Sequence, residues 1–223
     1  MSLLAAALTF HLAALPAALA CGLMQLAFWL RDRRQPAFAW WAASNLVGFV
    51  GAALMVARAY VPWWMSSALG NSIIIAASLL VWGGMLRFAR RPAPVRGFAV
   101  FALAFFAVFH GMWFLTHDLA LRVLLTSVGL GLVNAGTAID LVRSQRACLL
   151  HTRSLLAALF ALHAVFYLFR SVTAVTLEAD DEFLRSGGIQ NLALVIGTVK
   201  LLVWNLGVLF MWRELRRAEV RPR

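Results

Sequence analysis

The sequence predicts an all-α protein that crosses a membrane with seven helices, its N-terminus outside and its C-terminus in the cytoplasm. Of the 223 residues, 63% are hydrophobic and 13% are charged, which is more apolar surface than a soluble domain of this size could bury. The basic residues gather in alternate connections between the apolar runs. We therefore interpret the net charge of +11 as a signal of membrane orientation and not of nucleic-acid binding.

Seven apolar runs are long enough to be membrane-spanning helices, because about 20 helical residues cross the hydrocarbon core of a bilayer. In chain order they cover residues 3–30, 36–57, 61–86, 97–116, 123–142, 155–176 and 189–212. The first run lacks the basic start of a signal peptide, so we expect it to be a retained helix. One membrane domain, 1–212, is thus followed by a basic tail, 213–223, that we interpret as the start of a helix leading to a cytoplasmic output.

Arginines flank the runs unevenly and predict their orientation. The connections after the first, third, fifth and seventh runs carry fifteen: Arg31, Arg33, Arg34, Arg87, Arg90, Arg91, Arg96, Arg143, Arg146, Arg153, Arg213, Arg216, Arg217, Arg221 and Arg223. The other connections carry three: Arg58, Arg122 and Arg185. Because arginine and lysine gather on the cytoplasmic side, the first set is predicted to lie inside, and the acidic loop 177–188 outside.

Two segments suggest an internal repeat. "MLRFARR" (85–91) and "MWRELRR" (211–217) both read M-x-R-x-x-R-R, and Arg58 is matched by Arg170 at an offset of 112 residues. This pattern favours two parallel three-helix units joined by the fourth helix. Arginines at cytoplasmic helix ends also resemble one another by necessity, so both interpretations stay open.

Three runs carry polar residues at spacings that place them on one helix face. The sets are Ser67, Asn71 and Ser78; Ser127, Asn134 and Thr137; and Asn191, Thr198 and Asn205. Such stripes are typical of membrane helices that hydrogen-bond to one another. They are equally compatible with a central cavity lined by these faces.

Lys200 is the one lysine in the chain and lies in the middle of the last run. At eleven residues from the start of that run it is about 16 Å deep, too far for its amine to reach water easily. Gly197, Trp204 and Gly207 share its face, and the glycines leave room either for close packing or for a ligand. We expect Lys200 to line a central cavity, with Asn71, Asn134 and Thr198 as candidate hydrogen-bond partners; a purely structural bond to a neighbouring helix is the alternative.

Retinal and haem are the two cofactors that single features of the sequence suggest, and neither is firmly implied. A lysine in the seventh helix is typical of retinal proteins, but Ile196 stands where they carry an aspartate, and residues 61–86 contain no acid. Asp140 lies too close to the cytoplasmic end. His11 and His110 are expected at a similar depth, so they are weak candidates for a metal or haem site.

Arg170 is the second basic residue within a run, about six residues from the outer end of the sixth helix. Its paired donors suit planar anions, so it is expected to contact either the acidic loop or an anionic ligand. His163 lies seven residues deeper on the same face and joins the candidate ligand-binding set. That set consists of Lys200, Arg170, Asn71, Asn134, Thr198, His110, His163 and Trp204.

The stretch "WWAASNLVGFVGAALMVARAYVPWWMSSALGNSIIIAASLLVWGGMLRFARRP" (40–92) resembles the N-terminal membrane region of bacterial diguanylate cyclases, the GGDEF proteins. The matching positions are Trp41, Asn45, Arg58, Pro62, Trp63, Asn71, Gly84 and Arg87. Residues 154–171, which include Arg170, resemble the sixth helix of such regions. "RELRRAE" (213–219) resembles the short helix that leads into the cyclase domain, which is itself absent here.

This resemblance implies a sensory input module of the bacterial inner membrane, without a catalytic site of its own, that binds an unidentified ligand and signals to a cytoplasmic output. It also implies a homodimer, because diguanylate cyclases act in pairs. A small-solute transporter of three-plus-one-plus-three plan is an alternative, although Pro16 is the one proline within a helix interior. A haem- or retinal-binding protein is the other.

Overall fold

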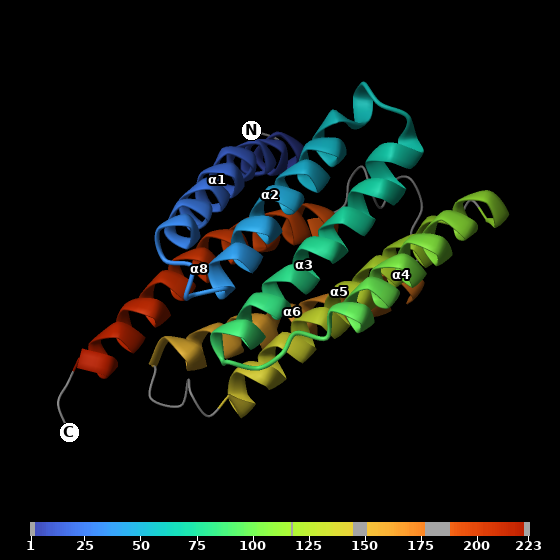
Figure 1. Ribbon diagram of the computed structural model, residues 1–223. Helices are drawn as coiled ribbons and strands as arrows, with labels where there is room; N and C mark the ends of the chain where they lie inside the picture. Colours follow the sequence, from blue (N-terminus) through green and yellow to red (C-terminus); the bar gives the residue numbers. More distant parts are fainter. Residues whose placement is uncertain (1–2, 117, 145–150, 177–187, 221–223) are drawn as a thin grey trace.

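The computed structural model describes residues 3–116, 118–144, 151–176 and 188–220, without the side chains of residues 3–11, 113, 188–191 and 218–220. Its helices are α1 (Leu3–Arg31), α2 (Ala37–Val56), α3 (Gly70–Phe88), α4 (Val95–Leu115), α5 (Leu119–Arg143), α6 (His151–Thr176) and α8 (Gly188–Val220) (Figure 1). A 3-10 turn, η1 (Ala57–Ala59), and a π-helical turn, η2 (Met65–Leu69), connect α2 to α3. Each of the seven α-helices among the described residues contains a stretch long and apolar enough to cross a membrane, which confirms the all-α prediction.

Six of the helices form a closed ring. Each packs against the next in the order α1, α2, α3, α5, α6, α8, and α8 returns to α1. Helix α4 lies outside this ring, where it packs against α3, α5 and η2. The first and last helices of the chain are therefore neighbours, so residues from all but one of the helices can meet at the centre of the bundle.

The two ends of the bundle differ in charge. The connections 32–36 and 89–94 and the last turns of α5 and α8 lie at one end, which we call the arginine-rich end. The α2–α3 connection and the start of α5 lie at the opposite end. Helix α8 continues without a break past residue 212 to Val220, so residues 213–220 of the predicted tail extend the last apolar helix.

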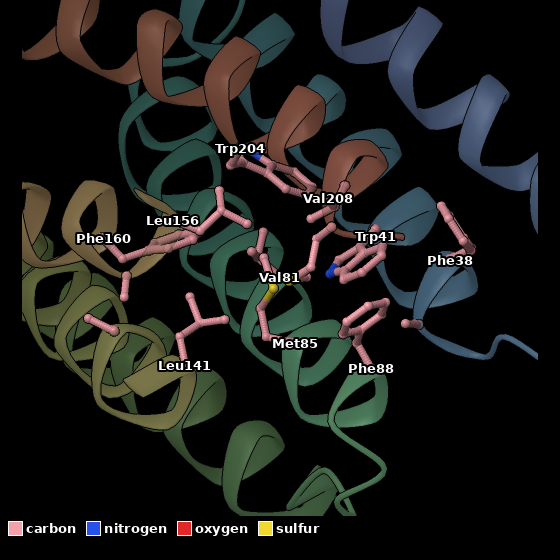
Figure 2. Close-up of a cluster of buried hydrophobic side chains, with 14 of the residues drawn as sticks. Phe38, Trp41, Val81, Met85, Phe88, Leu141, Leu156, Phe160, Trp204 and Val208 are labelled. Atoms are coloured by element: carbon pink, nitrogen blue, oxygen red, sulfur yellow. The ribbon is translucent and has the colours of Figure 1, made fainter. Parts of the chain in front are cut away.

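The half of the bundle nearer the arginine-rich end is filled by apolar side chains. Trp41 of α2, Met85 of α3, Leu156 of α6 and Met211 of α8 are at most 3% exposed and belong to one buried cluster (Figure 2). Trp204 and Val208 of α8 extend the same cluster toward the middle of the bundle. The arginine-rich half is thus held together by a single apolar cluster to which five helices contribute buried side chains.

Glycines allow the largest of these side chains to approach neighbouring helices. A Cβ atom added at Gly84 would collide with the indole of Trp41, and one at Gly83 would collide with Trp40. Helices α2 and α3 are therefore in close contact at their arginine-rich ends. Gly207 of α8 is covered in the same way by Leu156 of α6.

Candidate functional site

A cavity of about 240 Å³ lies between the six ring helices, from the middle of the bundle toward the end opposite the arginine-rich end. Small residues create much of this space, among them Ala14 and Ala18 of α1, Gly48 and Ala52 of α2, and Gly197 of α8. A Cβ atom at Gly197 would meet nothing within 4 Å. The two glycines beside Lys200 thus differ: Gly197 leaves open space, whereas Gly207 serves close packing.

Lys200 lines this cavity from α8. Its Nζ donates a hydrogen bond to Oδ1 of Asn134 on α5 at 2.6 Å and lies 5.1 Å from the ring centroid of Phe160 on α6. The expectation that Asn134 accepts from Lys200 is confirmed. No hydrogen bond from Lys200 to the other two candidate acceptors is found among the described residues; Asn71 donates to the carbonyl oxygen of Ser67 and Thr198 to that of Leu194, within their own helices. Both still line the cavity, as does Trp204.

Arg170 lines the same cavity from α6 and is 7% exposed. One guanidinium nitrogen donates to Oγ of Ser127 on α5 at 2.8 Å. The acidic loop that we considered as its partner lies outside the described residues. Two basic side chains, Arg170 and Lys200, therefore converge on one cavity, and the described residues that line it include no carboxylate. Such an arrangement suits a ligand with an anionic group and an apolar body, because the remaining lining is mostly alanine, glycine and aliphatic side chains.

The candidate histidines do not gather at this cavity. His163 is buried between α6 and α8, with Nδ1 2.8 Å from the carbonyl oxygen of Leu159 and Nε2 3.2 Å from that of Ile196. His110 lies on α4, outside the ring, where its ring contacts Phe106 and Trp64. The His11 side chain is outside the description. Among the described side chains, no group of three or more potential metal ligands comes together.

A cluster of three buried amides adjoins the cavity, and the sequence pattern singled out two of them, Asn45 and Asn205, but not Gln25. Gln25 of α1 donates to Oδ1 of Asn205 on α8 at 2.8 Å, and Nδ2 of Asn45 on α2 lies 2.9 Å from Oε1 of Gln25 and from Oδ1 of Asn205. Nδ2 of Asn205 in turn donates to Oδ1 of Asn45 at 3.1 Å. All three amides are at most 2% exposed. A glutamine within an apolar run is itself a signal, because such an amide must find a partner in a membrane.

These observations define a class: a helical protein in which seven of the described helices are long and apolar enough to span a membrane, with a basic cavity inside the helical ring whose described lining contains no carboxylate. No family model, curated protein or solved structure matches the chain.

Proposed function

We propose that the protein is a sensory input module of the bacterial inner membrane, which binds a ligand in the central cavity and signals along α8 to a cytoplasmic output. The observation that carries this proposal is the convergence of Lys200 and Arg170, from different helices, on a cavity without a described carboxylate. The Lys200 amine in such surroundings is costly unless something balances its charge. An anionic group on a largely apolar ligand supplies that balance.

Helix α8 connects the cavity to the arginine-rich end. It lines the cavity at Thr198 and Lys200, passes through the apolar core at Val208 and Met211, and continues to Val220. Lys200 and Val220 are twenty positions apart in α8, a distance of about 30 Å along the helix. A ligand that displaces Lys200 would shift α8 as one continuous helix. The shift would therefore reach the part of α8 beyond the apolar core.

A side-chain contact shows how α8 is held at that end. Glu214 accepts a hydrogen bond from Oγ1 of Thr152 at 2.8 Å and one from the backbone N–H of Thr152 at 3.3 Å. The carboxylate thereby caps the first turn of α6, whose N-terminal N–H groups lack helical partners. Movement of α8 would change this cap, which supports an output transmitted jointly by α6 and α8. The resemblance to diguanylate cyclase input regions suggests a cyclase as the output and a homodimer as the signalling form.

The proposal is tested by filling the cavity. The chain is fused to a diguanylate cyclase domain, and cyclic di-GMP formation is compared for the parent, Gly197→Leu and Gly111→Leu. Both glycines meet nothing within 4 Å, but Gly111 lies on α4, outside the ring, and is therefore a matched control. We expect Gly197→Leu to change output by about fivefold or more and Gly111→Leu to leave it unchanged.

Mass spectrometry of small molecules extracted from the purified parent and from Gly197→Leu provides the second measurement. A molecule that co-purifies with the parent and with Gly111→Leu, but not with Gly197→Leu, would identify the ligand. Output from Gly197→Leu equal to that of the parent would overturn the proposal.

A transporter remains the second candidate, because α1–α2–α3 and α5–α6–α8 occupy consecutive halves of the ring with α4 outside. That order supports the three-plus-one-plus-three plan. A transporter would exchange the co-purifying molecule across liposome membranes, and Gly197→Leu would abolish that exchange; a sensor would not exchange it.

A further inference from the structure

A second pocket, of about 380 Å³, lies at the arginine-rich end and shares no residue with the central cavity. Four arginines line it, together with Gln35 and two prolines: Arg34, Arg87, Arg90 and Arg91, with Pro36 and Pro92. They come from the connection 32–36 and from the last turn of α3 with the connection that follows it, two segments more than fifty residues apart in the sequence. Their convergence is a property of the fold and not of a local run of charge.

The packing of α2 against α3 creates this pocket, because it brings the α1–α2 turn beside the α3–α4 connection. The turn is held by Asp32, whose carboxylate accepts the backbone N–H of Arg34 at 3.1 Å and whose carbonyl oxygen accepts that of Gln35 at 3.3 Å. The connection is held by the N–H of Arg91, which donates to the carbonyl oxygen of Leu86 at 2.9 Å. Both walls of the pocket therefore have a defined backbone.

Arg90 occupies an unfavourable backbone conformation in one of these walls. Its φ is 60°, and it is the non-glycine residue with positive φ in the described part of the chain. The position follows the last turn of α3, where glycine or asparagine normally takes this left-handed conformation. The Cβ atom of an arginine makes this left-handed conformation unfavourable, whereas glycine would adopt it without strain. The arginine therefore points to a role for its side chain at this position.

The charges of the pocket are incompletely balanced. Arg91 forms an ion pair with Asp140 of α5, and Asp140 also accepts a hydrogen bond from Nε1 of Trp82 at 2.8 Å. No other salt bridge to these four arginines is found among the described residues. Even when the Asp32 carboxylate of the turn is counted together with that of Asp140, four guanidinium groups leave an excess of positive charge in a hollow of ligand size.

We propose that this pocket binds a phosphate group. Guanidinium groups match phosphate oxygens with paired donors, and several of them together select phosphate over a monovalent anion. The group belongs either to the headgroup of an anionic lipid or to a free phosphorylated molecule. Arg90 contributes a guanidinium that glycine, the residue favoured by the backbone, could not supply.

The experiment uses the purified full-length chain and measures its Tm. One arm titrates pyrophosphate in non-ionic detergent at constant ionic strength, maintained with NaCl. The other compares nanodiscs of phosphatidylcholine with nanodiscs that also contain phosphatidylglycerol. We expect one arm to raise Tm by about 5 °C or more. A rise with pyrophosphate identifies a free phosphate ligand, and a rise confined to phosphatidylglycerol identifies a lipid headgroup.

Arg90→Gly separates binding from stability. Without phosphate we expect its Tm to exceed that of the parent by about 2 °C, because the left-handed backbone no longer carries a side chain, while the phosphate-dependent rise is lost. Arg87→Gln should lose the rise as well. Arg143→Gln, an exposed arginine at the same end but outside the pocket, should keep it. The proposal is overturned if neither arm raises Tm, if NaCl alone reproduces the rise, or if Arg90→Gly and Arg87→Gln respond as Arg143→Gln does.

Discussion

Nζ of Lys200 on α8 lies 2.6 Å from Oδ1 of Asn134 on α5, so a single hydrogen bond joins two helices that are separated in the ring by α6. The asparagine is held for this contact, because its own Nδ2 donates to the carbonyl oxygen of Leu130 one turn earlier. The amine and the amide oxygen thus form one unit, and their substitutions should not act independently.

For this pair we predict that Lys200→Met reduces the loss of unfolding free energy caused by Asn134→Leu. Asn134→Leu alone should cost about 2 kcal/mol, because it leaves the amine without its acceptor in an apolar setting. Lys200→Met alone should change the free energy of unfolding by less than about 1 kcal/mol, since relief of amine burial offsets the lost bond. Denaturant unfolding in mixed micelles measures the cycle. Strict additivity of the two substitutions would show that the bond has no energetic weight.

Arg170→Gln should lower both stability and signalling. It removes the donor to Ser127 and one of the two charges of the cavity. We expect a loss of about 1–2 kcal/mol and an altered output of the cyclase fusion. Ser127→Ala is the control, because it removes the same hydrogen bond and keeps the charge. If Arg170→Gln changed neither Tm nor output, Arg170 would have no role in the site.

Asn205→Leu should destabilise the bundle, because it leaves the amides of Gln25 and Asn45 without a shared partner. We expect a cost of about 1–3 kcal/mol, measured as a lowered Tm in detergent. Ser72→Ala is a suitable comparison: Ser72 is also buried, but its hydroxyl bonds to the carbonyl oxygen of Ala68 in its own helix. An equal effect of the two substitutions would mean that the three-helix network adds nothing beyond local bonding.

The orientation of the chain is tested by cysteine labelling from the periplasm. In a background of Cys21→Ser and Cys148→Ser, a membrane-impermeant maleimide should modify a cysteine introduced at Asp118 and leave one at Pro92 unmodified. Both native residues are exposed. The expectation follows from the excess of arginines at the end that contains Pro92. Modification at Pro92 from the periplasmic side would reverse the orientation.

Long-range polar contacts were predictable only where one partner had few alternatives. Lys200 is too deep to reach water, so a polar partner on a neighbouring helix could be expected, and Asn134 was among the candidates. Asn71 and Thr198 looked equally suitable on spacing, yet the hydrogen bonds described for their side chains run to carbonyl oxygens of their own helices. Spacing indicates which residues share a face, but not whether a side chain bonds back to its own backbone or across to a neighbour.

The sequence by itself determined the seven helices and their approximate bounds, because a bilayer requires about 20 apolar residues per crossing and leaves every backbone group to be satisfied within the helix. It also determined that Lys200 and Arg170 needed partners. Only the tertiary structure decided the ring order, the exclusion of α4 with His110, and the opposite uses of Gly197 and Gly207. The sequences of helices of similar hydrophobicity do not indicate which helices pack together. The space beside a glycine depends on the side chain that the opposing helix presents.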